Sequence, residues 1–258
     1  MAMAMGKTRG KAGLPAGRVF TSVKRYAWLF VLLVALGGLW EPRLGLLLIP
    51  LMLTLMVMGF LKGKYWCGNL CPHGSFFDGI ILPWSRNSHI PAFFRSKFVA
   101  GLLLTLFIVM MGSRLVAVIP ALGQSGFLDI LGLVFVLNYF VVTVAGTLLA
   151  FLVNPRAWCV VCPMGTAQLL LYRLGSWLGV NKRWDLRLAA SDSNDCRVCK
   201  RCHRVCPLEL EPYPEHLENN SFDHGICLRC RTCVQHCPAG VLKFCSPQAG
   251  AEYALDCQ

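Results

Sequence analysis

The sequence predicts an all-α membrane domain of four transmembrane helices, followed by a smaller, cysteine-rich α+β domain. Three observations support this fold class. The 258 residues are 55% hydrophobic and only 15% charged, whereas soluble domains are about one quarter charged. The apolar residues gather in four runs in the first part of the chain. Most of the 14 cysteines fall into four short clusters, which is typical of metal binding rather than of disulfides.

The four apolar runs are the expected spans. A span needs roughly 20 apolar residues; the last two runs are long enough, the second is adequate and the first is short. The first two runs could instead form a re-entrant hairpin that does not cross. Trp28 and Trp40, which sit where interfacial aromatic residues belong, favour crossing. The runs are Tyr26–Trp40, Leu44–Leu61, Phe98–Pro120 and Phe127–Val153.

Basic residues predict the orientation. They concentrate before the first run and between the second and third, while the other two loops hold only Arg43 and Arg114. The positive-inside rule places both termini and the middle loop in the cytoplasm, so the chain is expected to be a multi-pass protein of the inner, cytoplasmic membrane. No small-residue cleavage site follows the first run, which indicates an uncleaved anchor. The net charge of +12 fits this topology, and we expect no nucleic-acid partner.

Every cysteine falls on the expected cytoplasmic side of the membrane, where thiols stay reduced.

Composition divides the chain into segments. The expected segments are a basic N-terminus (1–25), the four-span domain (26–155) with a cytoplasmic cysteine loop (62–97), a membrane-edge cysteine loop with a connecting segment (156–185), the α+β domain (186–248) and a tail (249–258).

Two cysteine quartets in the C-terminal domain follow the pattern C-x2-C-x2-C-x3-C-P. This is the spacing of two-cluster bacterial ferredoxins, in which three cysteines of one run and the fourth of the other bind each [4Fe-4S] cluster. Structural zinc also accepts four thiolates, but its sites usually use paired C-x2-C knuckles. We therefore expect two clusters: one on Cys196, Cys199, Cys202 and Cys237, and one on Cys227, Cys230, Cys233 and Cys206.

Other polar residues surround these quartets. Basic side chains between the ligands are expected either to raise the cluster potentials or to form a solvated face that rests on anionic lipid. The histidines His203, His224 and His236 are expected at the surface, and Cys245 and Cys257 as free thiols. The basic residues are Arg197, Lys200, Arg201, Arg204, Arg229 and Arg231.

Two further cysteine pairs follow the second and fourth apolar runs. The first pair is Cys67 and Cys71, and the second is Cys159 and Cys162; both are followed by proline and then glycine. The similar surroundings indicate an internal repeat. Our hypothesis is that the two pairs share one metal site, a third iron–sulfur cluster or another metal. Alternatives are a redox-active dithiol in each loop, or cysteines that line a contact with the C-terminal domain.

This layout resembles the NapH-type membrane ferredoxin proteins, and it is similar to the C-terminal halves of NosR-type and CcoG-type proteins. The four spans, Cys67-x3-Cys71-Pro72, the pair ending in Cys162-Pro163, and both quartets carry the resemblance over nearly the whole chain. It implies electron transfer at the cytoplasmic face, from menaquinol or ubiquinol towards a reductase system. The second pair, Cys159-x2-Cys162, is one residue shorter than the family's usual spacing.

The leading functional hypothesis is electron transfer between a membrane quinone and the two clusters expected in the C-terminal domain. His73 and Asp78, just after the first pair, are the candidates for a quinone and proton-handling site. Asp129 and Asn138 are the other polar candidates, although Asp129 could pair with Arg114. The expected partners are membrane lipid, the quinone pool, and a redox protein or a larger oxidoreductase complex.

Two other functional classes remain open from the sequence. One is an assembly or regulatory protein, such as a CcoG-like metal reductase or a redox sensor. The other is a membrane anchor subunit that docks a soluble dehydrogenase. Methionines in the apolar runs could offer thioether ligands, but in an apolar helix they more often pack. Whether the chain is itself an enzyme is left open.

Overall fold

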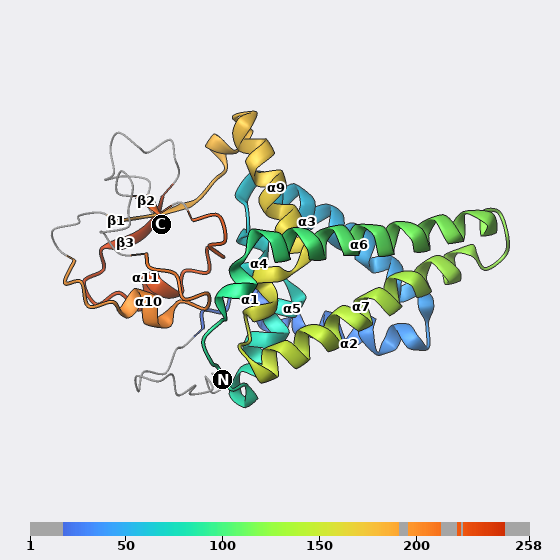
Figure 1. Ribbon diagram of the computed structural model, residues 1–258, viewed down its shortest axis with the longest axis horizontal. Coiled ribbons are helices and arrows are strands. Elements are labelled where there is room, and N and C mark those ends of the chain that lie inside the picture. The colour runs from blue at the N-terminus through green and yellow to red at the C-terminus, as the bar shows by residue number, and fades with distance from the viewer. Residues whose placement is uncertain (1–17, 191–195, 213–220, 223, 246–258) are drawn as a thin grey trace.

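The structure is a computed structural model that describes residues 18–190, 196–212, 221–222 and 224–245. Long helices lie on one side and a small sheet with two short helices lies on the other (Figure 1). Short helices that carry the membrane-edge cysteines lie between the two parts.

Four helices of the described chain are long and apolar enough to cross a membrane, so the prediction of four apolar helices is confirmed. The first candidate span, Ser22–Leu39, is broken into three pieces: α1 (Ser22–Tyr26), α2 (Trp28–Ala35) and the 3₁₀ helix η1 (Gly37–Leu39). The other three spans are η2 (Pro42–Leu47) continued by α3 (Leu48–Lys62), α6 (Lys97–Val118) continued by η6 (Ile119–Ala121), and α7 (Phe127–Leu152).

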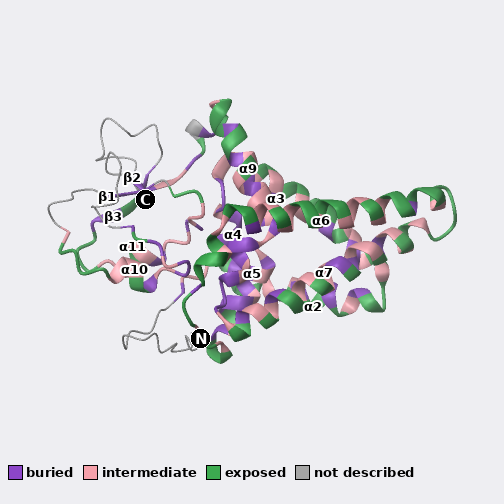
Figure 2. Cartoon of the chain, viewed as in Figure 1, coloured by how far each residue is buried: buried purple, intermediate pink, exposed green. Residues whose placement is uncertain are grey.

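These helices turn apolar side chains outward. Figure 2 shows long exposed stretches on α6, where Phe98 and Val116 are 76% and 64% exposed. Such a surface fits lipid rather than water as the surrounding solvent. Glycine permits one close helix approach: a Cβ on Gly132 of α7 would lie 2.2 Å from the Pro42 carbonyl oxygen of η2.

The loops at the far end of the helices are joined by one ion pair. The Arg43 Nε donates to Asp129 Oδ1 at 2.6 Å, and both side chains are exposed. The Asp129–Arg114 pair considered from the sequence is therefore wrong, because Arg43, at the start of η2, reaches Asp129 instead. Asn138, in the middle of α7, is buried, and its amide donates to the Val134 carbonyl.

Short helices follow each of the second and fourth spans. After α3 come α4 (Tyr65–Asn69) and α5 (Pro72–Phe76), and after α7 come α8 (Ala157–Val161) and α9 (Pro163–Trp177). The helices α9 and α3 pack along each other, as do α5 and α2. Other short elements complete this region: η3 (Phe77–Ile81), η4 (Leu82–Trp84), η5 (Ala92–Arg95) and η7 (Val180–Arg183).

The C-terminal part contains an antiparallel sheet in the order β2-β1-β3. Leu188 of β1 pairs with Phe222 on one side and with Phe244 on the other, and all three are buried. Cys245 is disulfide-bonded, so the expectation of a free thiol is wrong there, and Cys257 lies outside the described residues. The elements are β1 (Arg187–Ala190), α10 (Arg201–Val205), β2 (Ser221–Phe222), α11 (Thr232–Gln235) and β3 (Leu242–Cys245).

Candidate metal centres

The two membrane-edge cysteine pairs sit in the same local structure. Cys67 lies inside α4 and Cys159 inside α8. Cys71 and Cys162 are the N-cap residues of α5 and α9, with similar φ/ψ angles of −60°/123° and −53°/126°, and each precedes a proline at the first helical position. Because proline fixes the helix start, each second thiol is held where one helix ends and the next begins.

The four thiols of these pairs are brought together. Burial, and to a lesser extent the neighbouring Cys159, raise the pKa of Cys71 to about 12. The pKa of Cys67 is also raised well above its usual value. Burial is the largest cause, and Cys71 and Cys159 contribute smaller increases. Thiols from both repeats therefore act on one another, which realises the predicted juxtaposition. Whether they hold a metal is a separate matter, taken up as a proposal below.

Asp78 lies beside this site in a buried ion-pair network. The Arg156 guanidinium donates to both carboxylate oxygens, at 3.0 and 2.5 Å, and Lys24 Nζ donates at 2.7 Å. Arg18 Nε lies 3.8 Å away. Burial alone would raise the pKa of Asp78, but Arg156, Lys24 and Arg18 together lower it below its usual value. The carboxylate stays ionised, so these contacts favour a structural role over the proton-handling role suggested by its position.

His73 lies next to an apolar groove in the membrane part. The Thr143 hydroxyl donates to the Tyr139 carbonyl at 2.7 Å. His73 Nε2 lies 2.9 Å from the Thr143 hydroxyl oxygen. Because the hydroxyl has already donated its proton, His73 Nε2 is the donor to Thr143. Burial lowers the pKa of His73 to about 4, which keeps the ring neutral. The groove has a volume of about 280 Å³ between α2, α5 and α7, and Thr143 lines it together with Phe76 and Val144.

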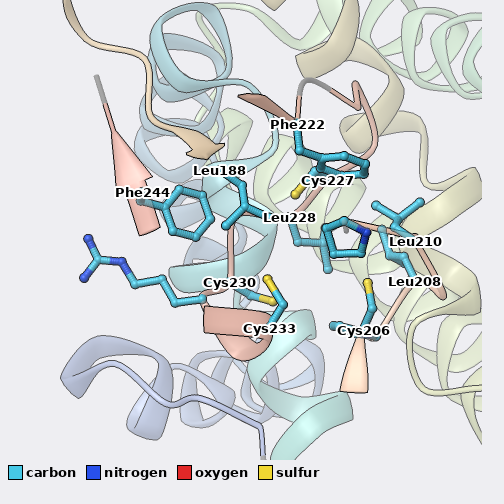
Figure 3. A pocket seen from close by; sticks show the side chains of 13 residues that line it. Leu188, Cys206, Leu208, Leu210, Phe222, Cys227, Leu228, Cys230, Cys233 and Phe244 are labelled. Carbon is cyan, nitrogen blue, oxygen red and sulfur yellow. The ribbon is translucent and has the colours of Figure 1, made fainter. Parts of the chain in front are cut away.

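In the C-terminal part, four thiols surround one apolar pocket (Figure 3). They are Cys206 from the first quartet and Cys227, Cys230 and Cys233 from the second. The same four residues form the ligand set expected for one of the two clusters. Leu188, Leu208, Phe222, Leu228 and Phe244 make up much of the remaining wall, and an apolar wall of this kind limits solvent access to a cluster.

The other four quartet cysteines do not line this pocket. Cys199 is exposed, whereas Cys196, Cys202 and Cys237 are partly buried. Burial, with smaller effects of Cys196 and Cys199, raises the pKa of Cys202 to about 11, so these three thiols are close enough to interact. Among the residues that the structure describes, no three His, Cys, Asp or Glu side chains are grouped so that they could hold a single metal ion. A cubane binds each thiolate through a different iron, so its ligands lie further apart than those of one ion.

Both quartets use the same unusual backbone. Val198 and Lys200 have φ angles of 44° and 54°, and Arg229 and Arg231, at the equivalent positions, have 51° and 60°. A β-branched residue such as Val198 rarely adopts this region, and such strain gathers at functional sites. Lys200 and Arg231, in the left-handed conformation, immediately precede α10 and α11. The third cysteine of each quartet, Cys202 or Cys233, is therefore the second residue of a short helix.

The second quartet rests directly on the first membrane-edge pair. A Cβ on Gly68 would lie only 2.0 Å from the Leu228 carbonyl oxygen. The Asn69 amide donates to the Arg229 carbonyl at 3.2 Å, and the Arg229 guanidinium binds Asp185 and the Lys62 carbonyl. Arg229 is therefore a buried tether, not part of a solvated basic face.

Sequence reasoning missed three residues at the membrane edge. Arg156 is fully buried and Lys64 is 2% exposed. Gln168 is also fully buried and accepts a hydrogen bond from the Cys67 thiol at 3.3 Å. The available signal was the basic residue that stands three positions before the first cysteine of each pair.

Comparisons with known proteins agree with this chemistry. A family described as "4Fe-4S binding domain" matches residues 44–91 and 132–183, together less than half of the chain. The matched segments contain the two membrane-edge pairs and end before both quartets. Each matched segment covers most of one apolar helix and the cysteine pair that follows it.

Two curated proteins are similar over parts of the chain. An uncharacterized protein of Methanocaldococcus jannaschii is 24% identical over 201 residues, which cover 73% of this chain and 67% of that protein. NAD(P)H-quinone oxidoreductase subunit I of Gloeobacter violaceus is 36% identical over 58 residues, which cover 19% of this chain and 28% of that subunit. No solved structure matches. The family match supports iron–sulfur binding by this chain of four apolar helices.

Proposed function

We propose that the chain is a multi-pass protein of the inner membrane that passes electrons between a membrane quinone or quinol and a redox partner. Both termini lie in the cytoplasm. Two [4Fe-4S] clusters in the C-terminal part and a third at the membrane edge carry the electrons. The family likeness of the two membrane-edge segments supports the third cluster.

One observation carries the proposal: the apolar groove, the membrane-edge cysteines and the second quartet follow one another in space. His73, two residues after Cys71, hydrogen-bonds Thr143 in the groove wall. Gly68, next to Cys67 in α4, lies directly against the Leu228 carbonyl in the second quartet. Short steps between redox centres are what electron transfer through a protein requires.

The donor sets suit the proposed clusters. Four cysteine thiolates bind a [4Fe-4S] cluster, and the membrane edge and the Figure 3 pocket each gather four thiols. When bound, such a cluster accepts and releases one electron at a time. The backbone N–H of Gly74 donates a hydrogen bond to the Cys71 sulfur, and hydrogen bonds to ligand sulfurs tune a cluster's potential.

The proposed order runs from the membrane outward. The cluster on Cys206, Cys227, Cys230 and Cys233 comes second, because its loop touches the membrane edge. The cluster on Cys196, Cys199, Cys202 and Cys237 comes last. Its first loop, residues 196–200, lies on the side of the C-terminal part away from the long helices (Figure 1), and Cys199 is exposed there.

A quinone fits the groove by its chemistry. The wall is apolar apart from Thr143 and Thr147, and ligand pockets typically combine such walls with a few placed polar groups. His73 holds the Thr143 hydroxyl at this wall, and it is our candidate for handling the proton at a quinone oxygen. The neutral ring suits hydrogen bonding in this position.

The test is reduction by quinol in proteoliposomes made without oxygen. A menaquinol or ubiquinol analogue should bleach the visible iron–sulfur absorbance of the wild type. Val144→Trp fills the groove and should abolish bleaching by quinol while leaving bleaching by dithionite intact.

The matched control is Val141→Trp on the same helix. Val141 is 53% exposed and does not line the groove, so quinol should still bleach this variant. Wild-type protein that no quinol bleaches contradicts the quinone proposal. Equal rates for Val144→Trp and the wild type contradict the assignment of the groove.

A further inference from the structure

Lys64 places a buried ammonium group at the membrane-edge site. Lys64 is only 2% exposed, and its Nζ lies 3.5 Å from the Cys159 carbonyl oxygen. Among the described residues, no carboxylate forms an ion pair with it. A buried charge without a partner is costly, so the surroundings of Lys64 call for negative charge.

Arg156 is the counterpart of Lys64 in the second repeat. Lys64-Tyr65-Trp66-Cys67 aligns with Arg156-Ala157-Trp158-Cys159. Lys64 reaches the carbonyl of Cys159, and Arg156 Nη1 donates to the carbonyl of Cys67 at 3.0 Å. Each cation thus crosses to the first cysteine of the other repeat.

Both cations lie close to Cys159. Lys64 Nζ lies 3.5 Å from its carbonyl oxygen, and the Arg156 guanidinium lies 3.5 Å from its sulfur. Arg156 also donates to the Cys67 carbonyl, so its guanidinium contacts both cysteine pairs.

The buried charges around the site do not balance. Arg18, Lys24, Lys64 and Arg156 supply four positive charges, and Asp78 supplies one negative charge. Neutral thiols or disulfides would leave this excess unmatched. A [4Fe-4S]²⁺ core with four thiolates carries two negative charges, and one-electron reduction adds a third.

From this arrangement we infer that Lys64 and Arg156 are paired counter-cations of the membrane-edge cluster, and that they raise its reduction potential. The inference rests on the proposed third cluster. A fixed positive charge stabilises the reduced form more than the oxidised form, because the reduced form is more anionic. Reduction adds one electron, supplied by dithionite in the test below, and the cations already in place compensate its charge.

The test is a redox titration of the full-length protein, followed by electron paramagnetic resonance. Lys64→Met removes the charge and keeps an unbranched side chain. The control is Lys62→Met, two residues earlier, where Nζ lies over the Tyr65 ring and the side chain is only partly buried. Lys64→Met should lower the midpoint potential of one cluster signal, and Lys62→Met should shift none.

Each outcome is decisive when iron is counted in the same samples. An unchanged midpoint in Lys64→Met that keeps all of its iron overturns the inference. A wild type with iron for only two clusters overturns the third cluster itself. Where Lys64→Met loses one cluster, Lys64→Arg decides: retained iron supports charge compensation, and equal loss shows that charge is not what the site requires.

Discussion

The membrane-edge pairs and the first C-terminal quartet both bring cysteines together, but they differ in whether the charged groups around them are buried or exposed. At the membrane edge, Lys64 and Arg156 are buried against the thiols, and regular helix starts hold Cys71 and Cys162. In the first quartet, Cys199 is exposed and the backbone is left-handed at Val198 and Lys200. The inner site has its counter-charges built in, whereas the outer one can use solvent and a partner.

The difference bears on how each site depends on the rest of the molecule. The inner site takes its residues from two repeats and an N-terminal segment, because Arg18 and Lys24 join Asp78 and Arg156. Each proposed outer site takes three cysteines from one short loop and the fourth from the other quartet, and it includes no residue of the long helices. We therefore expect substitutions near the inner site to affect the whole fold, and those near the outer site to act locally.

The largest effect is expected for Asp78→Asn. This change leaves Arg156, Lys24 and Arg18 buried without their carboxylate, and breaking a buried ion pair costs about 3–5 kcal/mol. Thermal unfolding in detergent should show a much lower midpoint or no folded protein. Asp129→Asn, which removes an exposed pair, should leave the midpoint unchanged. Equal midpoints for the two variants would contradict the contrast between buried and exposed charge.

The same carboxylate predicts a pH dependence. Arg156, Lys24 and Arg18 hold the pKa of Asp78 below its ordinary value of 3.8. A depressed pKa means that the contribution to stability is present above the ordinary value and is lost as the pH falls through the folded-state value. In the wild type, protonation of Asp78 at low pH should lower the free energy of unfolding. Any folded Asp78→Asn protein lacks this carboxylate, so its free energy of unfolding should fall less than that of the wild type as the pH drops below 3.8. Identical acid profiles would contradict it.

A smaller effect is expected for Gly68→Ala, which tests the contact between the two regions. The added Cβ would lie 2.0 Å from the Leu228 carbonyl, so the tail loop must shift, and overpacking of this kind costs about 1–3 kcal/mol. Stopped-flow reduction by quinol should be slower for the tail clusters, with iron content unchanged. Gly112→Ala, which has open space, should match the wild type; an equal rate for Gly68→Ala would remove the proposed electron step.

The smallest effect is expected at the outer loop. Arg197 and Arg204 are exposed, and exposed charges contribute up to about 1 kcal/mol to an interaction. Arg197→Gln should slow oxidation by the anionic acceptor ferricyanide less than about fivefold, and added salt should reduce the difference. A cationic ruthenium hexaammine acceptor should show no such loss. Equal losses with both acceptors would contradict an electrostatic role for this face.

The sequence predicted the four apolar helices because each one leaves a continuous apolar run in the chain. The similar surroundings of the two cysteine pairs also predicted that Cys67, Cys71, Cys159 and Cys162 lie near one another, as they do in the structure. The partners of Asp78 were not predictable, because Lys24 and Arg156 lie far from it along the chain. Arg43 took the place of Arg114 for the same reason: a count of loop charges does not say which loop tips meet.

Basic residues within the quartets were also harder to interpret than cysteines. Six similar side chains fall between the ligands, yet Arg229 is buried and binds Asp185 and Tyr172, while Arg197 points to solvent. Residue type and spacing define a ligand set, because cluster chemistry demands sulfur at fixed intervals. They do not define which face of a loop meets another domain.

The most direct test of the account is the iron and acid-labile sulfide content of the full chain purified without oxygen, together with its Cys67→Ser/Cys159→Ser double variant. We predict about twelve irons per wild-type chain, for three four-iron clusters, and about eight in the double variant. A wild type with about eight irons that the double variant does not change would contradict the membrane-edge cluster. A colourless protein that holds zinc would contradict the electron route as a whole.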